Sequence, residues 1–251
     1  MINRLWERLV RTGESLLGAP TDLCAYCRAS VKRYALPSLA LCSRCTNQIP
    51  WIESIQCPHC GRMERCMDCT RRGRSSLSFN RSAVKYDERM KEWLAAYKYG
   101  RNERLQALLS SMLFQTYKRY ENEYARSGAI HWITPVPVSR QRMEERGFNQ
   151  AGQLAAGFGA RASIPVVPLL GRRRDTAKQS YKSRSERLDD LKDAFAIDED
   201  GIKMILKKTV LRPINIVIID DVYTTGSTLH HCAKTIAEHA DANVYGLTWA
   251  R

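Results

Sequence analysis

The chain has 251 residues, which is enough for one or two domains with a sizeable core. No apolar run approaches the roughly 18 residues that span a bilayer, and the first residues lack a secretory signal, so we expect a cytoplasmic protein. The net charge of +14, from 40 basic and 26 acidic residues, favours nucleic acid, phosphorylated metabolites or an acidic membrane surface as partners, although a solvated basic face would carry the same charge.

Residues 1–20 are predicted to form a basic amphipathic helix. Ile2, Leu5, Trp6 and Leu9 recur at helical spacing, and charged side chains cover the other side. A helix of this kind can lie on a membrane, so peripheral contact with the inner face of the membrane is one expectation. Packing of the helix on the body of the protein is the alternative.

Eight of the nine cysteines form four CxxC pairs within residues 21–75, which we expect to be a separate zinc-binding module. The pairs are Cys24/Cys27, Cys42/Cys45, Cys57/Cys60 and Cys66/Cys69. Two residues between thiolates let one turn aim both sulfurs at one ion, and two such turns complete a tetrahedral site. We expect sequential pairing of the turns, although a cross-braced arrangement is open. Because protein sulfurs fill every position, the one or two Zn²⁺ ions would be structural.

Residues 78–251 are predicted to form an α/β domain with a mostly parallel sheet, after a flexible linker at Thr70–Ser76. Strands are expected at the apolar runs 81–86, 130–138, 164–170, 214–219 and 243–249. The clearest helices cover 90–98, 105–117, 150–158 and 229–239. This alternation of strands and helices is typical of a parallel sheet flanked by helices. The strongly basic residues 171–187 are interpreted as a mobile functional loop or a disordered segment.

The stretch Val217–Leu229 reads VIIDDVYTTGSTL and joins a buried strand to the start of a helix. Its loop offers N–H and O–H donors to a phosphate at a helix N-terminus. The loop residues are Thr224, Thr225, Gly226, Ser227 and Thr228. Asp220 and Asp221 would repel a phosphate, but their oxygens can accept hydrogen bonds from a sugar diol. Together the two features predict a site for ribose 5-phosphate.

This stretch resembles the 5-phosphoribosyl 1-pyrophosphate (PRPP) motif of type I phosphoribosyltransferases. The four CxxC pairs and further segments make the chain similar to the ComF family, bacterial late-competence proteins associated with DNA uptake. These segments are AAYKYGRNERL (95–105), ITPVPVS (133–139), RGFNQ (146–150) and TAKQSYKSRSERLDDLKDAF (176–195). The resemblance runs from about Leu23 to the C-terminus. One departure is Asp190, at a position where the family usually has Asn.

The resemblance implies a type I phosphoribosyltransferase-like domain that follows the zinc module in the chain. Asp220 and Asp221 would hold the ribose hydroxyls, and residues 224–228 would hold the 5-phosphate. Pyrophosphate with Mg²⁺ would need a second anion site after an early strand, which points to Ser139 and Arg140. Lys98 is a further candidate, and Arg142, Arg146, Arg172 to Arg174 and Arg184 could close over the site.

Three functions are consistent with this reading. The first is a cytoplasmic competence protein that binds PRPP and single-stranded DNA during natural transformation, with other competence or DNA-translocation proteins as partners. Its charge, its zinc module and aromatics such as Tyr26, Trp51 and Tyr181 suit strand binding. The second is a housekeeping phosphoribosyltransferase that transfers ribose 5-phosphate to a nucleobase or an amine. The third is a zinc-dependent adaptor that contacts only proteins. The motif predicts a ligand rather than a reaction, so binding is better supported than catalysis.

Overall fold

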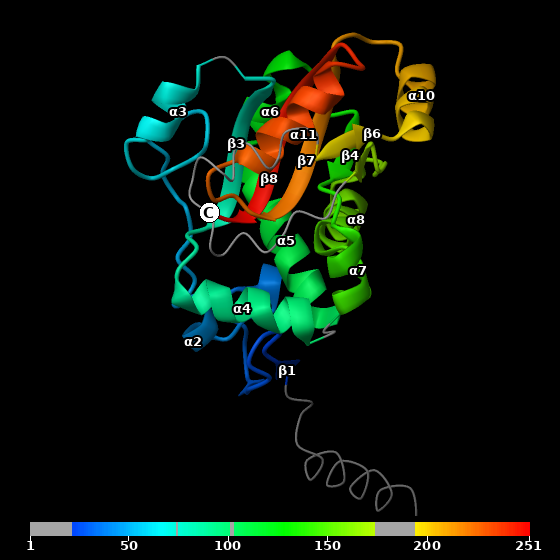
Figure 1. Ribbon diagram of the computed structural model, residues 1–251. Coiled ribbons are helices and arrows are strands. Elements are labelled where there is room, and N and C mark those ends of the chain that lie inside the picture. The colour runs from blue at the N-terminus through cyan, green and yellow to red at the C-terminus, as the bar shows by residue number, and fades with distance from the viewer. Residues whose placement is uncertain (1–21, 74, 101–102, 174–193) are drawn as a thin grey trace, which may run out of the picture. The chain divides into compact units, whose positions relative to one another are not determined.

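The computed structural model describes residues 22–73, 75–100, 103–173 and 194–251 (Figure 1). The predicted helix at 1–20 and the basic loop beyond Arg173, with Arg174, Tyr181, Arg184 and Asp190, lie outside these residues. By compactness the chain divides into two units, Met1–Ile49 and Pro50–Arg251. None of the helices in the described part combines the length and the apolar character of a membrane span.

The first unit is built from short elements around the first four cysteines. Strands β1 (Asp22–Leu23) and β2 (Ser30–Val31) pair antiparallel, and they are followed by the 3-10 helix η1 (Pro37–Leu39) and by α2 (Ser43–Thr46). Leu39 and Leu41 are buried, but most of the other described side chains of this unit are at least partly exposed. Such a small apolar core contributes little stability without a cross-link or a metal ion.

A four-stranded sheet forms the centre of the second unit, with the strand order β3-β8-β7-β4. The strands are β3 (Leu77–Val84), β4 (Trp132–Pro135), β7 (Ile214–Val222) and β8 (Ala242–Ala250). All three pairings are parallel, and residues 214–219 of β7 are buried. A continuous apolar run is typical of a parallel strand that is covered on both faces. The predicted fold class, a mostly parallel α/β sheet preceded by cysteine-rich sequence, is confirmed.

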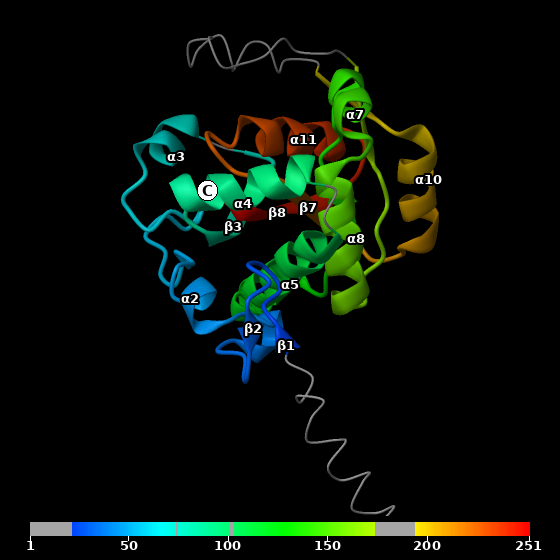
Figure 2. The ribbon, with the colours of Figure 1, turned by 90° about the horizontal axis from the view of Figure 1, so that it is seen from below.

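Helices cover both faces of this sheet. α5 (Glu103–Arg119) and α8 (Gln150–Ala162) pack on one face, and α11 (Ser227–Ala237) packs on the other (Figure 2). α4 (Glu88–Tyr99) begins at Asp87, whose side chain accepts a hydrogen bond from the N–H of Met90. The other elements are α3 (Met67–Arg72), α6 (Glu121–Tyr124), η2 (Ala125–Ser127), α7 (Arg140–Arg146), β5 (Leu170–Arg172), β6 (Phe195–Ile197) and α10 (Glu199–Lys208).

The strand predicted at 164–170 is largely wrong. Only a single parallel bridge joins Val166 to Ile133, and β5 begins at Leu170 in a separate two-stranded sheet with β6. Pro165 and Pro168 have no N–H to donate, so this segment cannot continue a ladder along β4. Two backbone bonds remain, from Ile133 N–H to the Pro165 oxygen and from Val167 N–H to the Ile133 oxygen.

The linker predicted at 70–76 is wrong in its first half. Thr70, Arg71 and Arg72 form the last turn of α3, which begins after Cys66. The hydroxyl of Thr70 donates to the main-chain oxygen of Cys66, and the helix ends at Gly73, whose φ is 72°. The small and basic composition of this stretch therefore belongs partly to a helix that carries Cys69.

Candidate functional site

Asp220 and Asp221 lie at the carboxyl end of β7, the strand between β8 and β4. The N–H of Asp221 donates to Oδ1 of Asp220 at 2.8 Å. Lys98 of α4 reaches Asp221, with its Nζ 2.6 Å from Oδ2. Both partners of this ion pair are less than one-fifth exposed, so solvent screens it less than a surface pair. The structure thus brings Lys98 to the predicted diol-binding carboxylates.

The surroundings of Asp220 favour its protonated form. Burial, together with the negative charge of Asp221, raises the pKa of Asp220 to about 8. The N–H of Asp221 and the positive charges of Lys98 and Arg142 act in the opposite direction but do not outweigh burial. A ligand that brings positive charge or hydroxyl donors to this carboxyl would favour loss of the proton.

The hydroxyl-rich residues 224–228, which we call the phosphate loop, connect β7 to the first turn of α11. Gly226 has a φ of 79°, in the left-handed region that favours glycine, and no side chain caps the helix start. The hydroxyls of Thr225 and Ser227 are 2.9 Å apart. The N–H of Ser227 donates to the Thr225 hydroxyl at 3.4 Å. The loop therefore places several hydroxyls and N–H groups at the start of α11, the arrangement that binds a phosphate.

A cavity of about 160 Å³ lies between the carboxylates and the segment that follows β4. Three arginines line it: Arg142 and Arg146 of α7 and Arg172 of β5. Nε of Arg146 is buried without a hydrogen-bond partner among the described residues. Carboxylates on one side and guanidinium groups on the other suit a ligand that carries both hydroxyl and anionic groups.

Two predicted anion contacts, Ser139 and Arg140, do not line this cavity in the described residues. Ser139 is the N-cap of α7, where its buried hydroxyl accepts from the N–H of Arg142 at 3.4 Å. Arg140 points to solvent, with its side chain 87% exposed and its Nε 2.9 Å from Glu144. The arginines of α7 that do line the cavity, Arg142 and Arg146, lie two and six residues after Arg140.

Asn149 and Gln150 also line the cavity, and neither is among the contacts predicted from the sequence. Nδ2 of Asn149 donates to the main-chain oxygen of Val136 at 3.1 Å, and Nη1 of Arg146 donates to Oε1 of Gln150 at 2.8 Å. They hold the segment after β4 and the arginine in place. Both belong to the RGFNQ segment (146–150), which precedes and begins α8 and is part of the resemblance to the ComF family.

The second cysteine group, Cys57, Cys60, Cys66 and Cys69, lies in the same compact unit as the sheet. Its four sulfurs lie within 4.8 Å of one another. Gly61, at a φ of 71°, ends the first turn, and a Cβ there would lie 2.7 Å from the main-chain oxygen of Asn80. The N–H of Asn80 in turn donates to the His59 oxygen at 2.6 Å, so the turn sits directly against β3.

Contacts join this second group to the phosphate loop. Nη2 of Arg72, in the last turn of α3, donates to the main-chain oxygen of Thr225 at 2.7 Å. Nη1 of the same side chain is buried without a hydrogen-bond partner among the described residues. Burial and the positive charge of Arg72 lower the pKa of His230, in the first turn of α11, to about 3. His230 is therefore neutral at physiological pH, and its Nδ1 lies 2.5 Å from the Ser75 hydroxyl.

The first cysteine group, Cys24, Cys27, Cys42 and Cys45, gathers in the first unit, again with all four sulfurs within 4.8 Å. Sγ of Cys24 accepts from the N–H of Cys42, and Sγ of Cys42 accepts from the N–H of Cys45, both at 3.4 Å. Both groups follow the sequential pairing that the spacing favoured, rather than the cross-braced one.

The chemistry of the sulfurs fits a bound cation. Burial and neighbouring sulfurs raise the pKa of Cys45 and of Cys69, because several thiolates cannot share a small site unaided. Burial also opposes ionisation of Cys24, but N–H groups of Cys42, Cys27 and Tyr26 lower the pKa of this thiol to about 6. A Zn²⁺ ion would remove the repulsion by binding all four sulfurs as thiolates.

Curated proteins similar to this chain are competence proteins. Competence protein ComFC of Bacillus subtilis (strain 168) is 33% identical over 216 residues, which cover 82% of this chain and 81% of that protein. Competence protein ComFC of Streptococcus pneumoniae is 31% identical over 204 residues, 79% of this chain and 81% of that protein. Competence protein F of Haemophilus influenzae is 24% identical over 237 residues, 90% of this chain and 96% of that protein.

Among solved structures, adenine phosphoribosyltransferase from Saccharomyces cerevisiae matches with a TM-score of 0.33 and 16% identity. The match covers 57% of this chain and 68% of that one. No protein-family model matches the chain.

Proposed function

The chain belongs to the ComF family of competence proteins, and we propose that it binds PRPP with Mg²⁺, and single-stranded DNA, during DNA uptake in the cytoplasm. One observation carries the PRPP part of this proposal. The carboxylates of Asp220 and Asp221, the phosphate loop and a cavity lined by arginines meet at the carboxyl end of β7. In open α/β sheets this edge is where ligands bind.

Each part of PRPP has a matching group at this edge. The ribose hydroxyls would donate to the two carboxylates, and the 5-phosphate would accept from the phosphate loop and the first N–H groups of α11. Pyrophosphate would lie against Arg142, Arg146 and Arg172, which replace Arg140 as the proposed contacts. Mg²⁺ bound with PRPP would neutralise part of the pyrophosphate charge.

Two structural Zn²⁺ ions complete the proposal, one in each cysteine group. All four positions of each ion would be filled by sulfur, so the metal would have no open position for chemistry. The zinc ions would stabilise the first unit, which has a small core, and would hold α3 against the phosphate loop in the second.

The DNA part of the proposal is supported by the net charge of +14 and by the similarity of the chain to competence proteins. A protein that neutralises phosphates with Lys and Arg releases counterions, so its affinity for a strand falls steeply with salt. We therefore expect affinity for a labelled oligothymidylate to fall by about ten-fold or more between 50 and 200 mM salt. Binding that is absent, or insensitive to salt, would contradict this part.

Isothermal titration calorimetry with PRPP and Mg²⁺ tests the PRPP part, with Asp220→Ala/Asp221→Ala as the variant. We expect binding by the natural chain and its loss in the variant, with zinc content unchanged. Natural transformation should fail in cells that carry the same variant, and transformation that persists would separate competence from this site. Release of pyrophosphate from PRPP with one nucleobase would instead indicate a phosphoribosyltransferase.

A further inference from the structure

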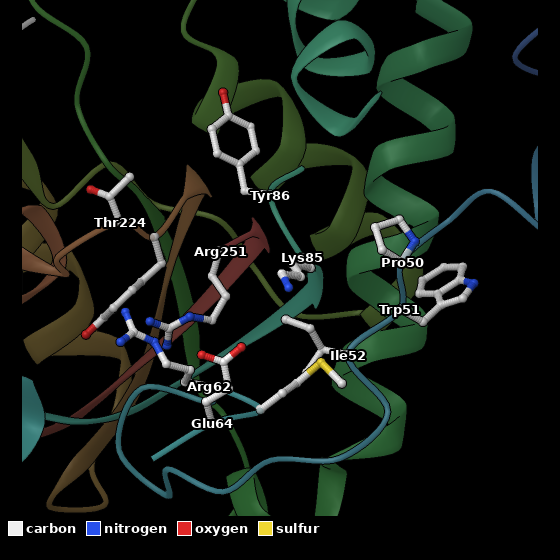
Figure 3. A pocket seen from close by; sticks show the side chains of 11 residues that line it. Pro50, Trp51, Ile52, Arg62, Glu64, Lys85, Tyr86, Thr224 and Arg251 are labelled. Carbon is white, nitrogen blue, oxygen red and sulfur yellow. The ribbon is translucent and has the colours of Figure 1, made fainter. Parts of the chain in front are cut away.

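A second and larger cavity opens at the carboxyl edge of the sheet, where β3 and β8 end (Figure 3). Its volume is about 660 Å³, within the range of roughly 300–1,000 Å³ that is typical of ligand sites. The strand order places it on the side of the phosphate loop away from β4 and the arginine-lined cavity. Thr224 of the phosphate loop lines it, so the two cavities share this loop as a common wall.

Aromatic and basic side chains line this larger cavity. Trp51 lies before β3 in the chain and Tyr86 lies just after it, and both rings are partly exposed. Arg62, Lys85 and Arg251 supply three positive charges, against the single carboxylate of Glu64. In Figure 3 the guanidinium groups lie on one side of the pocket and the indole of Trp51 on the other.

The backbone of the cavity wall is held by hydrogen bonds to β3. The N–H of Lys85 donates to the Pro50 oxygen at 2.9 Å, and the N–H of Ile52 donates to the Ala83 oxygen at 3.0 Å. These bonds fix the segment that carries Trp51 while leaving its ring partly exposed. The backbone that carries the indole is therefore held in place, which lowers the entropic cost of ordering this segment when a ligand binds.

The second cysteine group shapes the opposite wall. Arg62 and Glu64 belong to the five residues between Cys60 and Cys66. Arg251 donates from Nη1 to the main-chain oxygen of Cys60, and its guanidinium lies 5.0 Å from the ring centre of Tyr223. The two arginines are thus placed by the cysteine turns rather than by the sheet alone.

We propose that this cavity binds a nucleotide of single-stranded DNA, with its base on Trp51 and its phosphate beside Arg62, Lys85 and Arg251. The inference rests on the proposed function, because it assigns a binding site to the single-stranded DNA proposed there. An aromatic platform with basic side chains around it matches the way sequence-tolerant proteins hold single strands. Because Thr224 of the phosphate loop lines this cavity and Thr228 lines the arginine-lined one, the nucleotide would lie next to the proposed 5-phosphate position of PRPP.

Fluorescence anisotropy with a labelled oligothymidylate tests the inference on the full chain. Trp51→Ala should weaken strand binding by about ten-fold, and Trp51→Phe should retain most of it, because phenylalanine keeps a face for stacking. Lys85→Gln should weaken binding by about three-fold or more and lower its salt dependence. Lys234→Gln, on α11 and outside the cavity, changes the net charge equally and should have little effect.

Two further measurements separate the outcomes. PRPP affinity and zinc content should be unchanged in all four variants, which shows that they fold. If the natural chain binds the strand and the cavity variants bind it equally well, the inference fails while the proposed function stands. If no strand binds, the proposed function fails in its DNA part. In that case, thymidine 5′-monophosphate should be tested. Binding that is lost in Trp51→Ala would assign the cavity to free nucleotides, and no binding at all would overturn the inference as well.

Discussion

Arg72 donates a hydrogen bond from Nη2 to the main-chain oxygen of Thr225 at 2.7 Å, across 153 positions of the sequence. Arg72 lies three residues after Cys69, in the same short helix. Thr225 is the second residue of the phosphate loop. This one contact links the conformation of the loop to α3, which begins after Cys66 and carries Cys69, two members of the second cysteine group.

Arg72→Gln should therefore weaken PRPP binding. A hydrogen bond from a charged donor contributes about 1.5–3 kcal/mol, so we expect roughly a ten-fold or larger loss of affinity by calorimetry. Arg71→Gln is the matched control, because Arg71 is exposed on the same helix and its loss changes the charge equally. Equal affinities of the two variants would show that the contact does not hold the loop.

Loss of metal from the two cysteine groups should have different consequences. Cys66→Ser should remove one equivalent of zinc and weaken PRPP binding, because α3 begins directly after Cys66. Cys27→Ser should remove the other equivalent and leave PRPP affinity close to that of the natural chain. Metal analysis and calorimetry on both purified variants check this. The expectation is contradicted if the two substitutions affect PRPP binding equally.

The residues that the sequence revealed best are those in which local pattern and chemistry agree. The buried run before Asp220 predicted β7, and two-residue spacing predicted both cysteine groups. The residues that would contact the pyrophosphate were harder to predict. The position of Arg140 after β4 suggested a contact, but its side chain faces solvent. The packing of α7 decides which of its faces lies toward the carboxylates. The sequence does not indicate this face, because the seven residues of the helix have no clear apolar stripe.

Two other features depend on contacts between distant segments. Nothing near Arg72 in the sequence indicates that it reaches Thr225, because that contact exists only once α3 lies beside the phosphate loop. The cavity beside Trp51 likewise combines residues that precede β3, residues that follow it and Arg251, which follows β8. The periodicity of apolar residues predicts single helices and strands, but it does not predict which distant segments contact one another.

Gly226→Ala should disrupt the phosphate loop. A Cβ at this position would lie 2.1 Å from Oη of Tyr223, in addition to the strain of a φ of 79°. We expect a loss of at least about 3 kcal/mol in the free energy of unfolding, and loss of PRPP binding. Gly147→Ala is the control, because its φ is 80° but nothing lies within 4 Å of its Cβ position. It should lose only about 1–2 kcal/mol, and equal losses would show that the contact with Tyr223 is unimportant.

Asp220→Asn should stabilise the ligand-free protein at alkaline pH. Between pH 3.8, the ordinary pKa of this carboxyl, and about pH 8, its pKa here, the folded chain holds a proton that the unfolded chain has lost. The contribution of Asp220 to the free energy of unfolding therefore falls as the pH rises through this window. At pH 8 the free energy of unfolding of the Asp220→Asn variant should exceed that of the natural chain by about 1–3 kcal/mol in chemical denaturation, and at pH 4 the two should differ little. Asp241→Asn, at an exposed carboxyl, should show no such gain.

Binding of PRPP with Mg²⁺ should strengthen as the pH rises from 7 to 9. The diol is held by carboxylates, so the proton that Asp220 carries below its pKa of about 8 must leave when the ligand binds. The ionised fraction then rises about ten-fold over this range, and affinity should rise by a similar factor. Calorimetry at pH 7 in two buffers of different ionisation enthalpy should show release of close to one proton. Asp220→Asn should bind more weakly at every pH without this dependence. A natural chain whose affinity is flat from pH 7 to 9 would mean that Asp220 keeps its proton and donates, rather than accepts, a hydrogen bond at the ribose.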